Sequence, residues 1–407
     1  MSIFEQYKGL RKENYYLFIG KIVTCLGSMI YPVLTLILNQ KLGMNATGVA
    51  TYTVVSGVAI LPAIIIGGKL ADKYNKKNII IICDLISISL YITCGVIPLS
   101  YMTIVFLIIA SGFQMIEEPS YDALIADITC TEKRESAYSL LYLGQNIGLV
   151  ASPTIAGILF NNYLWLSFII SGVAIAFSTI LIYTKVKDIT PVKQEKDDKY
   201  QKERDGESVF RILLENKVIL LFMLVQAIYW AVYHQYTYML PLDMGRIHGE
   251  NGAIIYGSVA SINCIAVVIF TPVITSCFRK MQHTIKYLTG EVLRLTGYVL
   301  FLLFLGKVPF YYIAMILFTF GEIFSTISSG PYLYSRITAS HRGRIDGVRQ
   351  FSHSMIYGIL TLYLGMIYDD YGNVQAWMLL FALLGIAILG TLILILCDRR
   401  RYAELYR

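Results

Sequence analysis

Long hydrophobic runs separated by short polar segments recur along the whole chain of 407 residues. A run of about 20 apolar residues is long enough to cross the ~30 Å hydrocarbon core of a bilayer as a helix. We predict twelve such spans, at residues 14–38, 46–68, 78–98, 101–127, 137–160, 163–184, 218–240, 251–277, 285–306, 309–333, 347–368 and 374–396. The pattern therefore predicts an all-α membrane protein. The first run is full length and follows a short polar head, so we interpret it as a span and not as a cleavable signal peptide.

The composition supports a membrane protein and argues against other classes. Hydrophobic residues make up 56% of the chain and charged residues only 15%, too few to cover a soluble domain of this size. The seven cysteines are scattered without metal or redox spacing, so we expect no disulfide framework, no metal and no cofactor. The sequence also lacks zinc-protease and ATP-binding loop motifs, which argues against an enzyme and against an ATP-driven pump.

The basic residues are distributed by side of the membrane. Of the 34 Lys and Arg residues, the ones in predicted outer loops are Lys41, Arg246 and Lys307. Those within predicted spans are Lys21, Arg294 and Arg349. All other Lys and Arg residues lie in the predicted inner segments. By the positive-inside rule, we expect a multi-pass protein of the cell inner (plasma) membrane with both termini in the cytoplasm. Topology accounts for the net charge of +7, so the charge does not indicate a nucleic-acid partner.

One long polar segment divides the spans six and six. Residues 185–217 are dense in charges of both signs and poor in apolar residues, as in a solvated, flexible linker. We therefore predict an N-terminal six-helix bundle at residues 1–184, a cytoplasmic linker at 185–217 and a C-terminal six-helix bundle at 218–407.

The two halves also resemble each other at an offset of about 210 residues. The matching positions are Pro62 and Pro272, Gly112 and Gly321, Ile128-Thr129 and Ile337-Thr338, Arg134 and Arg344, and Gly148 and Gly358. Two six-helix repeats indicate a transporter that works by alternating access, with its site between the repeats near the membrane midplane.

The polar loop after the second span carries a motif. Its sequence, GGKLADKYNKKNII, resembles the signature loop of the major facilitator superfamily, Gly-x-Leu-Ala-Asp-Arg-x-Gly-Arg-Arg/Lys. The matching residues are Gly68, Leu70, Ala71, Asp72, Lys73, Lys76 and Lys77. The resemblance implies the twelve-helix fold of that family and a conformational latch, in which Asp127 at the inner end of the fourth span is the matching acid. We expect the glycines to allow close helix packing and Asn75 to adopt a left-handed turn in place of the family's usual glycine.

A second motif lies in the fifth span. The stretch GQNIGLVASPTIAGI resembles the antiporter motif of the family, Gly-x-x-x-Gly-Pro-x-x-Gly-Gly. The matching positions are Gly148, Ser152, Pro153, Ala156 and Gly157, with Ser152 and Ala156 in place of glycines. The resemblance implies proton-coupled export. The alternative is that these small residues only pack two helices together.

Three carboxylates lie in the fourth span: Glu117, Glu118 and Asp122. An ionised acid in the membrane is costly, so we expect these groups to face a wet cavity, pair with a base or hold a proton. Gln114, Glu118 and Tyr121 share one helical face, which favours Glu118 over Glu117 as the cavity residue. The alternative is a structural pairing with Lys21 or with a partner on another helix. The span lacks the Arg that related drug antiporters carry four residues before Gly112, which increases the importance of the acids.

The tenth span contains a further candidate acid, Glu322, in a Gly-Glu pair that resembles bacterial multidrug/proton antiporters of the lactococcal type. Polar and aromatic residues at helical spacing predict further cavity-lining positions, namely Lys21, Ser28, Gln226, Tyr229, Trp230, Tyr233 and Arg349. His353 is deep enough in its span to titrate as a coupling group. By contrast, we expect Glu291 and Arg294 to form a structural ion pair, and Asp84 to be a partner of the signature loop.

These observations favour a proton-coupled exporter of lipophilic or cationic small molecules, a monomer in the lipid bilayer with the proton as coupling ion. The alternative is a carrier for one specific metabolite, and anionic metabolites are among the candidates. Such a carrier would use Lys21, Arg294 or Arg349 to bind its substrate. A membrane-embedded enzyme or a receptor leaves the repeat and the signature loop unexplained. The sign of the charges that line the cavity distinguishes the first two hypotheses.

Overall fold

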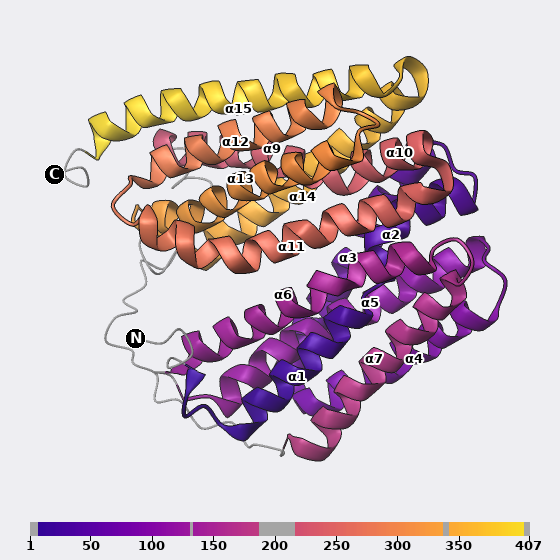
Figure 1. The fold of residues 1–407 in the computed structure, drawn as a ribbon. Coiled ribbons are helices and arrows are strands. Elements are labelled where there is room, and N and C mark those ends of the chain that lie inside the picture. The colour runs from indigo at the N-terminus through magenta and orange to yellow at the C-terminus, as the bar shows by residue number, and fades with distance from the viewer. Residues whose placement is uncertain (1–6, 131–132, 187–215, 337–341, 403–407) are drawn as a thin grey trace. The chain divides into compact units, whose positions relative to one another are not determined.

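The computed structural model describes residues 7–130, 133–186, 216–336 and 342–402, and every regular element within these ranges is helical (Figure 1). The first half of the chain forms α1 Lys12–Gly27, α2 Ile30–Leu36, the π-helix η2 Ile37–Lys41, α3 Ala46–Lys73, α4 Lys76–Val96, α5 Tyr101–Ile128, α6 Arg134–Leu159 and α7 Leu164–Lys185. The second half forms α9 Lys217–His234, α10 Tyr236–His248, the 3-10 turn η4 Gly249–Asn251, α11 Gly252–Cys277, α12 His283–Leu303, α13 Val308–Tyr334, α14 Arg342–Tyr371 and α15 Asn373–Arg401. The all-α prediction is confirmed.

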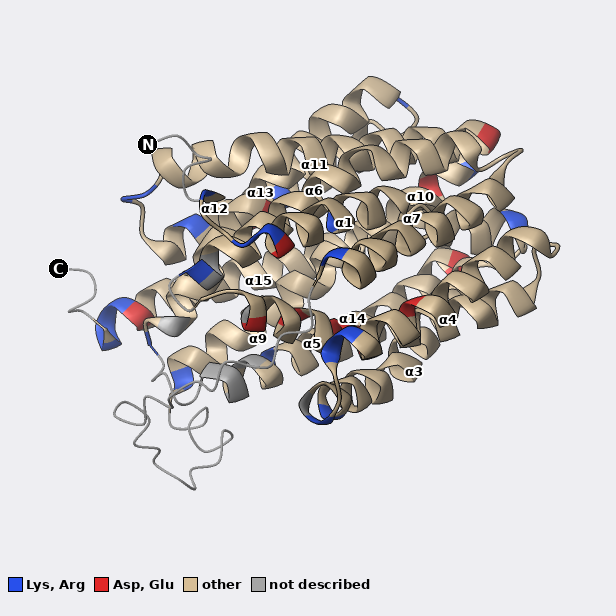
Figure 2. Ribbon diagram, turned by 90° about the horizontal axis from the view of Figure 1, so that it is seen from below, with Lys and Arg blue, Asp and Glu red and all other residues tan. Residues whose placement is uncertain are grey.

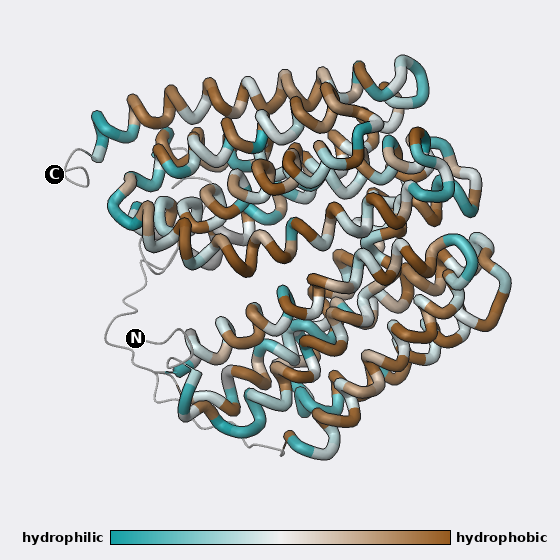
Figure 3. Tube along the Cα trace, viewed as in Figure 1, coloured by the Kyte–Doolittle hydropathy of each residue, from teal (hydrophilic) through white to brown (hydrophobic). Residues whose placement is uncertain are grey.

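Among the described residues, eight segments are long and apolar enough to cross a membrane by length and composition. One of them, Lys217–Cys277, is 61 residues long and covers two predicted spans. The helices α6, α12 and α14 also coincide with predicted spans, but polar residues lower their hydropathy below that of the eight segments. The count of twelve therefore stays a prediction. Figure 3 shows hydrophobic residues along the lengths of the helices, and Figure 2 shows Lys and Arg gathered mainly near helix ends.

The chain groups into two compact units. The first unit consists of Met1–Met44, Thr51–Gln194 and Met244–Val268. The second unit consists of Asn45–Ala50, Glu195–Asp243 and Ile269–Arg407. The predicted bundle boundaries stay a prediction, and most of the predicted linker lies outside the described residues.

The first predicted span is broken in the middle. The chain leaves helical geometry at Ser28, with φ −74° and ψ 59°, and α2 begins two residues later. Pro32 explains the position of the break, because a proline ring clashes with the carbonyl four residues before it. Two carbonyls at the break accept hydrogen bonds from serines of neighbouring helices: Ser171 Oγ donates to Gly27 O at 2.5 Å, and Ser152 Oγ donates to Ser28 O at 2.9 Å. Such replacement bonds are what a broken helix needs inside a membrane.

The seventh predicted span is interrupted more mildly, at Gln235 between α9 and α10, where the backbone keeps near-helical angles of φ −67° and ψ −14°. Tyr298 on α12 donates its hydroxyl to the carbonyl of Val232 at 2.7 Å. The side chain of Gln235 is fully buried and donates to the hydroxyl of Thr361 on α14 at 2.9 Å. Polar side chains from neighbouring helices therefore hold this break, as they do in the first span.

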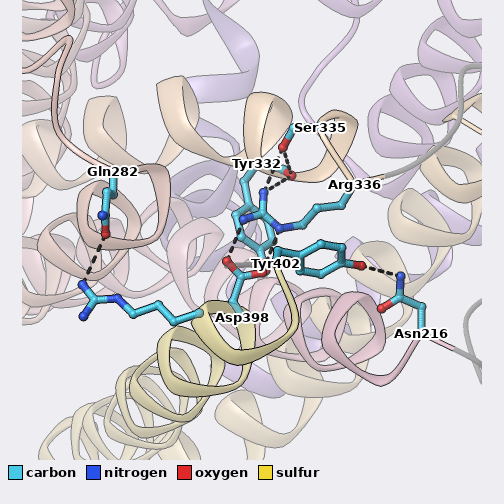
Figure 4. A network of polar contacts seen from close by, with 8 residues as sticks. Asn216, Gln282, Tyr332, Ser335, Arg336, Asp398 and Tyr402 are labelled. Carbon is cyan, nitrogen blue, oxygen red and sulfur yellow. Dashed lines mark hydrogen bonds and ion pairs between the residues drawn. The ribbon is translucent and has the colours of Figure 1, made fainter. Parts of the chain in front are cut away.

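A buried ionic network joins three helix ends in the second unit (Figure 4). Arg336, just after α13, donates two hydrogen bonds to Asp398 on α15, at 2.8 and 2.6 Å, and the two side chains are 5% and 0% exposed. Tyr332 also donates to Asp398, at 2.9 Å. Asn216, which precedes α9, donates to the hydroxyl of Tyr402 at 2.7 Å. These contacts attach the ends of α13 and α15 to each other and the start of α9 to Tyr402.

Candidate functional site

The first unit contains a polar cavity of about 260 Å³ between α1, α4, α5 and α7. Seven of the residues predicted for the site line it: Lys21, Ser28, Gln114, Glu117, Glu118, Tyr121 and Asp122. Asp84, Tyr31, Tyr91, Ser171 and Ser178 complete most of its polar wall. The structure therefore brings together the acids of the fourth predicted span and the polar face of the first.

Asp84 is the residue of this cavity that the sequence analysis misassigned. It lies on α4, is only 5% exposed, and accepts a hydrogen bond from Thr179 on α7 at 2.7 Å. It lines the same cavity as Glu117 on α5, and the two carboxyl groups interact electrostatically. The expectation that Asp84 serves the signature loop is wrong, because its helical face points to α5 and α7.

Glu117 and Glu118 both line the cavity, since successive helical residues are about 100° apart and the cavity is wide enough to meet both. They differ in burial. Glu117 Oε2 is buried and has no hydrogen-bond partner among the described residues, whereas Glu118 is exposed. The preference for Glu118 as the cavity residue is therefore not supported, and Glu117 is the acid that meets a second acid.

Lys21 supplies the positive charge of this cavity. Its Nζ lies 5.8 Å from the ring centroid of Tyr121. Within the described ranges, no ion pair joins Lys21 to Glu117 or Glu118. The alternative of a structural pairing with Lys21 is therefore not seen among the described residues, and the cavity holds one lysine against the carboxyl groups of Asp84, Glu117, Glu118 and Asp122.

The second unit contains a smaller cavity of about 130 Å³ between α9, α12 and α13. Five predicted residues line it: Gln226, Tyr229, Trp230, Tyr233 and Glu322. Its other lining residues are Tyr287, Arg294, Ser325, Thr326 and Ser329. Glycines let α12 and α13 approach closely here, since a Cβ on Gly290 would lie 2.7 Å from the carbonyl oxygen of Gly321.

Arg294 is the central charge of this second cavity. It is 2% exposed, and its guanidinium carbon lies 4.1 Å from the ring centroid of Tyr229 and 4.3 Å from that of Tyr233. Glu291 is fully buried one turn earlier, and among the described residues neither of its carboxyl oxygens has a hydrogen-bond partner. The predicted ion pair between Glu291 and Arg294 is therefore wrong, because the guanidinium packs against aromatic rings of α9 instead.

Two predicted site residues on α14 line neither of these cavities. His353 is 4% exposed and stacks on Trp230, with ring centroids 5.0 Å apart and an interplanar angle of 19°. Arg349 is half-buried and lies near Tyr287. His353 thus contacts Trp230, a residue that lines the second cavity, without lining that cavity itself.

The residues of the predicted latch include one ion pair with the matching acid, and their role as a latch stays a prediction. Lys76 and Asp127 form an ion pair at 2.5 Å with side chains 20% and 21% exposed, and Lys77 donates to the carbonyl of Val186 at 2.7 Å. Lys73 is exposed and lies over the ring of Tyr74. The side chain of Asp72 lies outside the described residues.

Two details of the latch loop differ from the prediction. Asn75 has φ −64° and ψ 118°, so it is extended and not left-handed. Its side chain instead caps α4 by accepting from the backbone N–H of Asn78 at 3.2 Å. Gly67, not Gly68, is the glycine at a close helix contact. A Cβ on Gly67 would lie 2.4 Å from the carbonyl oxygen of Ile116, whereas a Cβ on Gly68 would meet no atom within 4 Å.

The small residues of the fifth-span motif lie at close helix contacts within the first unit. A Cβ on Gly148 would lie 2.4 Å from the carbonyl oxygen of Ile22, and one on Gly157 would lie 2.5 Å from that of Ala253. Ser152 bonds the broken end of α1, and Pro153 lies inside α6. The packing role is therefore visible in the structure, and the implied role in export stays a prediction.

Long apolar helices, polar cavities within them and broken spans define a multi-pass membrane transporter. The profile of the Major Facilitator Superfamily matches residues 17–359. The chain belongs to this superfamily, and it is a transporter and not an enzyme.

Known proteins resemble the chain at low identity. The Na(+), Li(+), K(+)/H(+) antiporter of Planococcus maritimus is 19% identical over 347 residues, which cover 78% of this chain and 80% of the relative. The crystal structure of a POT family transporter in complex with 5-aminolevulinic acid is 16% identical, covers 97% of both chains and has a TM-score of 0.76. A crystal structure of a mutant of the nucleoside transporter NupG is 14% identical, with 94% of this chain and 100% of that chain covered and a TM-score of 0.75. These structures share the fold, and their substrates differ from one another.

Proposed function

We propose that this protein is a proton-coupled secondary transporter that exports lipophilic or cationic small molecules by alternating access. The observation that carries the proposal is that Glu117 and Asp84, two acids from different helices, line the wall of the same cavity and interact electrostatically. The likeness to a cation/proton antiporter supports the coupling ion.

The two acids form a proton site for a physical reason. Two neighbouring carboxylates repel each other when both are ionised, and burial makes an unpaired charge costly, so the pair is stabilised by one shared proton. The groups that face the pair are Lys21 from α1, Cys83 from α4, and Glu118, Tyr121 and Asp122 from α5. A cationic solute that enters the cavity would stabilise the ionised pair and release the proton. Binding of solute and proton would then be mutually exclusive, which is the requirement for antiport.

The charge of the first cavity favours cationic solutes. Four carboxyl groups face one lysine, and the tyrosines Tyr31, Tyr91 and Tyr121 add aromatic surface. Aromatic faces and carboxylates together attract lipophilic cations. Glu322, which lies beside Tyr233 in the second cavity, is the second candidate for proton handling.

The proposal is tested with purified protein in liposomes that have an acidic lumen. We expect gradient-driven uptake of ethidium, a permanent cation, that an ionophore collapsing the pH gradient abolishes. Glu117→Gln is expected to lose gradient-driven uptake at least tenfold while it retains ethidium exchange in the absence of a gradient. Glu250→Gln, which changes an exposed acid in η4, is the matched control and should behave like the native chain. Unchanged gradient-driven uptake by Glu117→Gln would exclude the assigned proton site.

A further inference from the structure

Arg294 occupies an aromatic site whose chemistry suits cations in general. Its guanidinium carbon lies 4.1, 4.3 and 5.2 Å from the ring centroids of Tyr229, Tyr233 and Phe318. The side chain is 2% exposed, so rings and not water surround its charge. Glu322 lines the same cavity and adds an acid to the wall. Aromatic faces and a carboxylate together attract lipophilic cations, whether the cation belongs to the chain or comes from outside it.

Glu291 offers the guanidinium a second partner, one turn away on α12. This side chain is 0% exposed, and within the described ranges neither of its carboxyl oxygens has a hydrogen-bond partner. The Nε of Arg294 is buried without such a partner in the same part of the chain. The two side chains interact electrostatically, and helical residues three apart are spaced for direct pairing. Two sets of partners therefore lie within reach of the guanidinium: the aromatic rings and the carboxyl group of Glu291.

The free space beside the guanidinium has a surface that fits a second cationic group. Trp230 adds a further aromatic ring to the wall. Gln226 Oε1 is a buried acceptor with no hydrogen-bond partner among the described residues, as a donor on an incoming group would require. The volume of about 130 Å³ is below the ~300 Å³ of small pockets for whole drug-sized ligands, so the space takes one flat group of a solute. Departure of the guanidinium would enlarge it.

We propose that the second cavity is a cation site that Arg294 fills in this structure, and that a lipophilic cation binds there by displacing the guanidinium towards Glu291. Arg294 is then an internal competitor of the solute, and it weakens solute binding by the free energy of its own displacement. The inference rests on the proposed function for its class of solute. It assigns a solute site to the second cavity, in addition to the site in the first.

The test follows the fluorescence of Trp230 in the full chain purified in detergent. The probe is 1-methylnicotinamide, a flat permanent cation that quenches tryptophan fluorescence, and nicotinamide is its neutral counterpart. We expect saturable quenching by the cation, and we expect nicotinamide to compete at least tenfold more weakly. The chain has three tryptophans, so Trp230→Phe, which keeps an aromatic ring, should lose the saturable part of the quenching and thereby locate it.

Two substitutions in the cavity region test the competition itself. Arg294→Gln removes the competitor and should bind the probe at least tenfold more tightly than the native chain, whereas loss of a merely structural residue would weaken binding. Glu291→Gln removes the alternative partner of the guanidinium. It should weaken binding at least tenfold in the native background and less than threefold in the Arg294→Gln background. Arg279→Gln, which removes an exposed arginine, is the matched control and should bind the probe like the native chain.

Unchanged or weaker probe binding by Arg294→Gln would overturn the proposal, and so would equal weakening by Glu291→Gln in both backgrounds. If Arg294→Gln does not fold, native-like binding by Glu291→Gln alone overturns it. Ethidium uptake in liposomes separates this proposal from the proposed function. Coupled uptake by the native chain without tighter probe binding by Arg294→Gln refutes only the cation site. Tighter probe binding by Arg294→Gln in a protein that does not transport ethidium refutes only the export function.

Discussion

Glu117 occupies a position that an ionised side chain would avoid, with one oxygen buried and a second carboxyl group beside it. Arg294 is held in a position that a cation accepts only because aromatic rings surround it. Both residues lie on helices whose packing is set by many other side chains. The chain therefore keeps two ionisable side chains in surroundings that disfavour their charged forms, as expected at functional sites.

The hydroxyl of Ser152 gives a prediction about the break in the first span. Ser152→Ala removes the donor to the carbonyl of Ser28 and leaves that carbonyl without this bond, so we expect a loss of about 1–2 kcal/mol of unfolding free energy. Thermal unfolding in detergent measures the change. Ser89→Ala is the control, because Ser89 is exposed and its hydroxyl bonds only its own helix at Leu85. Equal effects of the two substitutions would contradict the capping role.

The sequence predicted seven of the 18 residues that line the first cavity and five of the ten that line the second, and the reason is periodicity. Residues of one face of one helix, such as Gln114 and Tyr121 or Tyr229 and Tyr233, recur at helical spacing and could be predicted. Asp84 and Arg294 could not be assigned, because their roles depend on which helix faces them. The predicted pairing of Glu291 with Arg294 followed sequence spacing alone and missed the aromatic rings of another helix.

At the scale of elements, close contacts between helices depend on individual glycines. Gly67 lets α3 approach the backbone of α5, whereas Gly68 has open space where a Cβ would lie. Gly68→Ala should therefore change the unfolding free energy by less than about 1 kcal/mol, in the stabilising direction. Gly67→Ala should destabilise the protein by about 1–3 kcal/mol, because backbone atoms of Ile116 must move. Chemical denaturation of both variants checks the order, and a larger loss in Gly68→Ala would contradict the packing described for α3.

The two helix-end ion pairs should differ in strength. Asp127 and Arg336 lie 209 residues apart, and each directly precedes an Ile-Thr pair, so they occupy matching positions in the two halves. The two halves therefore carry opposite charges at this position. Lys76→Ala breaks a pair that is about one-fifth exposed, and should cost about 1 kcal/mol. Asp398→Asn leaves Arg336 buried without its acid, and should cost about 3–5 kcal/mol.

Unfolding temperatures of the two variants, measured side by side in detergent, provide the comparison. Similar losses would show that burial does not govern the strength of these pairs.

The broken spans are a further feature of this scale that was not predicted, although Pro32 carried the signal for the first of them. The second break has no proline four residues on, and its signal is the pair of buried polar partners Gln235 and Thr361, which only the fold reveals.

At the scale of the whole molecule, hydropathy, the half-repeat and the signature loop were sufficient to predict the family, which the profile match confirms. Hydropathy and the half-repeat extend over hundreds of residues, so single substitutions do not prevent their detection in the sequence. Substrate identity is not encoded in this way, because cavity side chains decide it and one fold serves many solutes.

The predicted topology can be checked independently of transport. Because Lys and Arg concentrate in one set of loops, a fluorescent protein fused to the C-terminus should fluoresce in the cytoplasm of a bacterial host. Alkaline phosphatase fused at the same point should be inactive, since it folds only outside the cytoplasm. The reverse pattern would contradict a cytoplasmic C-terminus.

The central claim is that solute and proton compete at the pair of Glu117 and Asp84. Its most direct test is the proton release that accompanies ethidium binding, followed with an indicator dye in weakly buffered detergent solution. We expect the native protein to release protons in proportion to bound ethidium, and Glu117→Gln to bind ethidium with little or no release. Equal release by both proteins, or binding by the native protein without release, would contradict it.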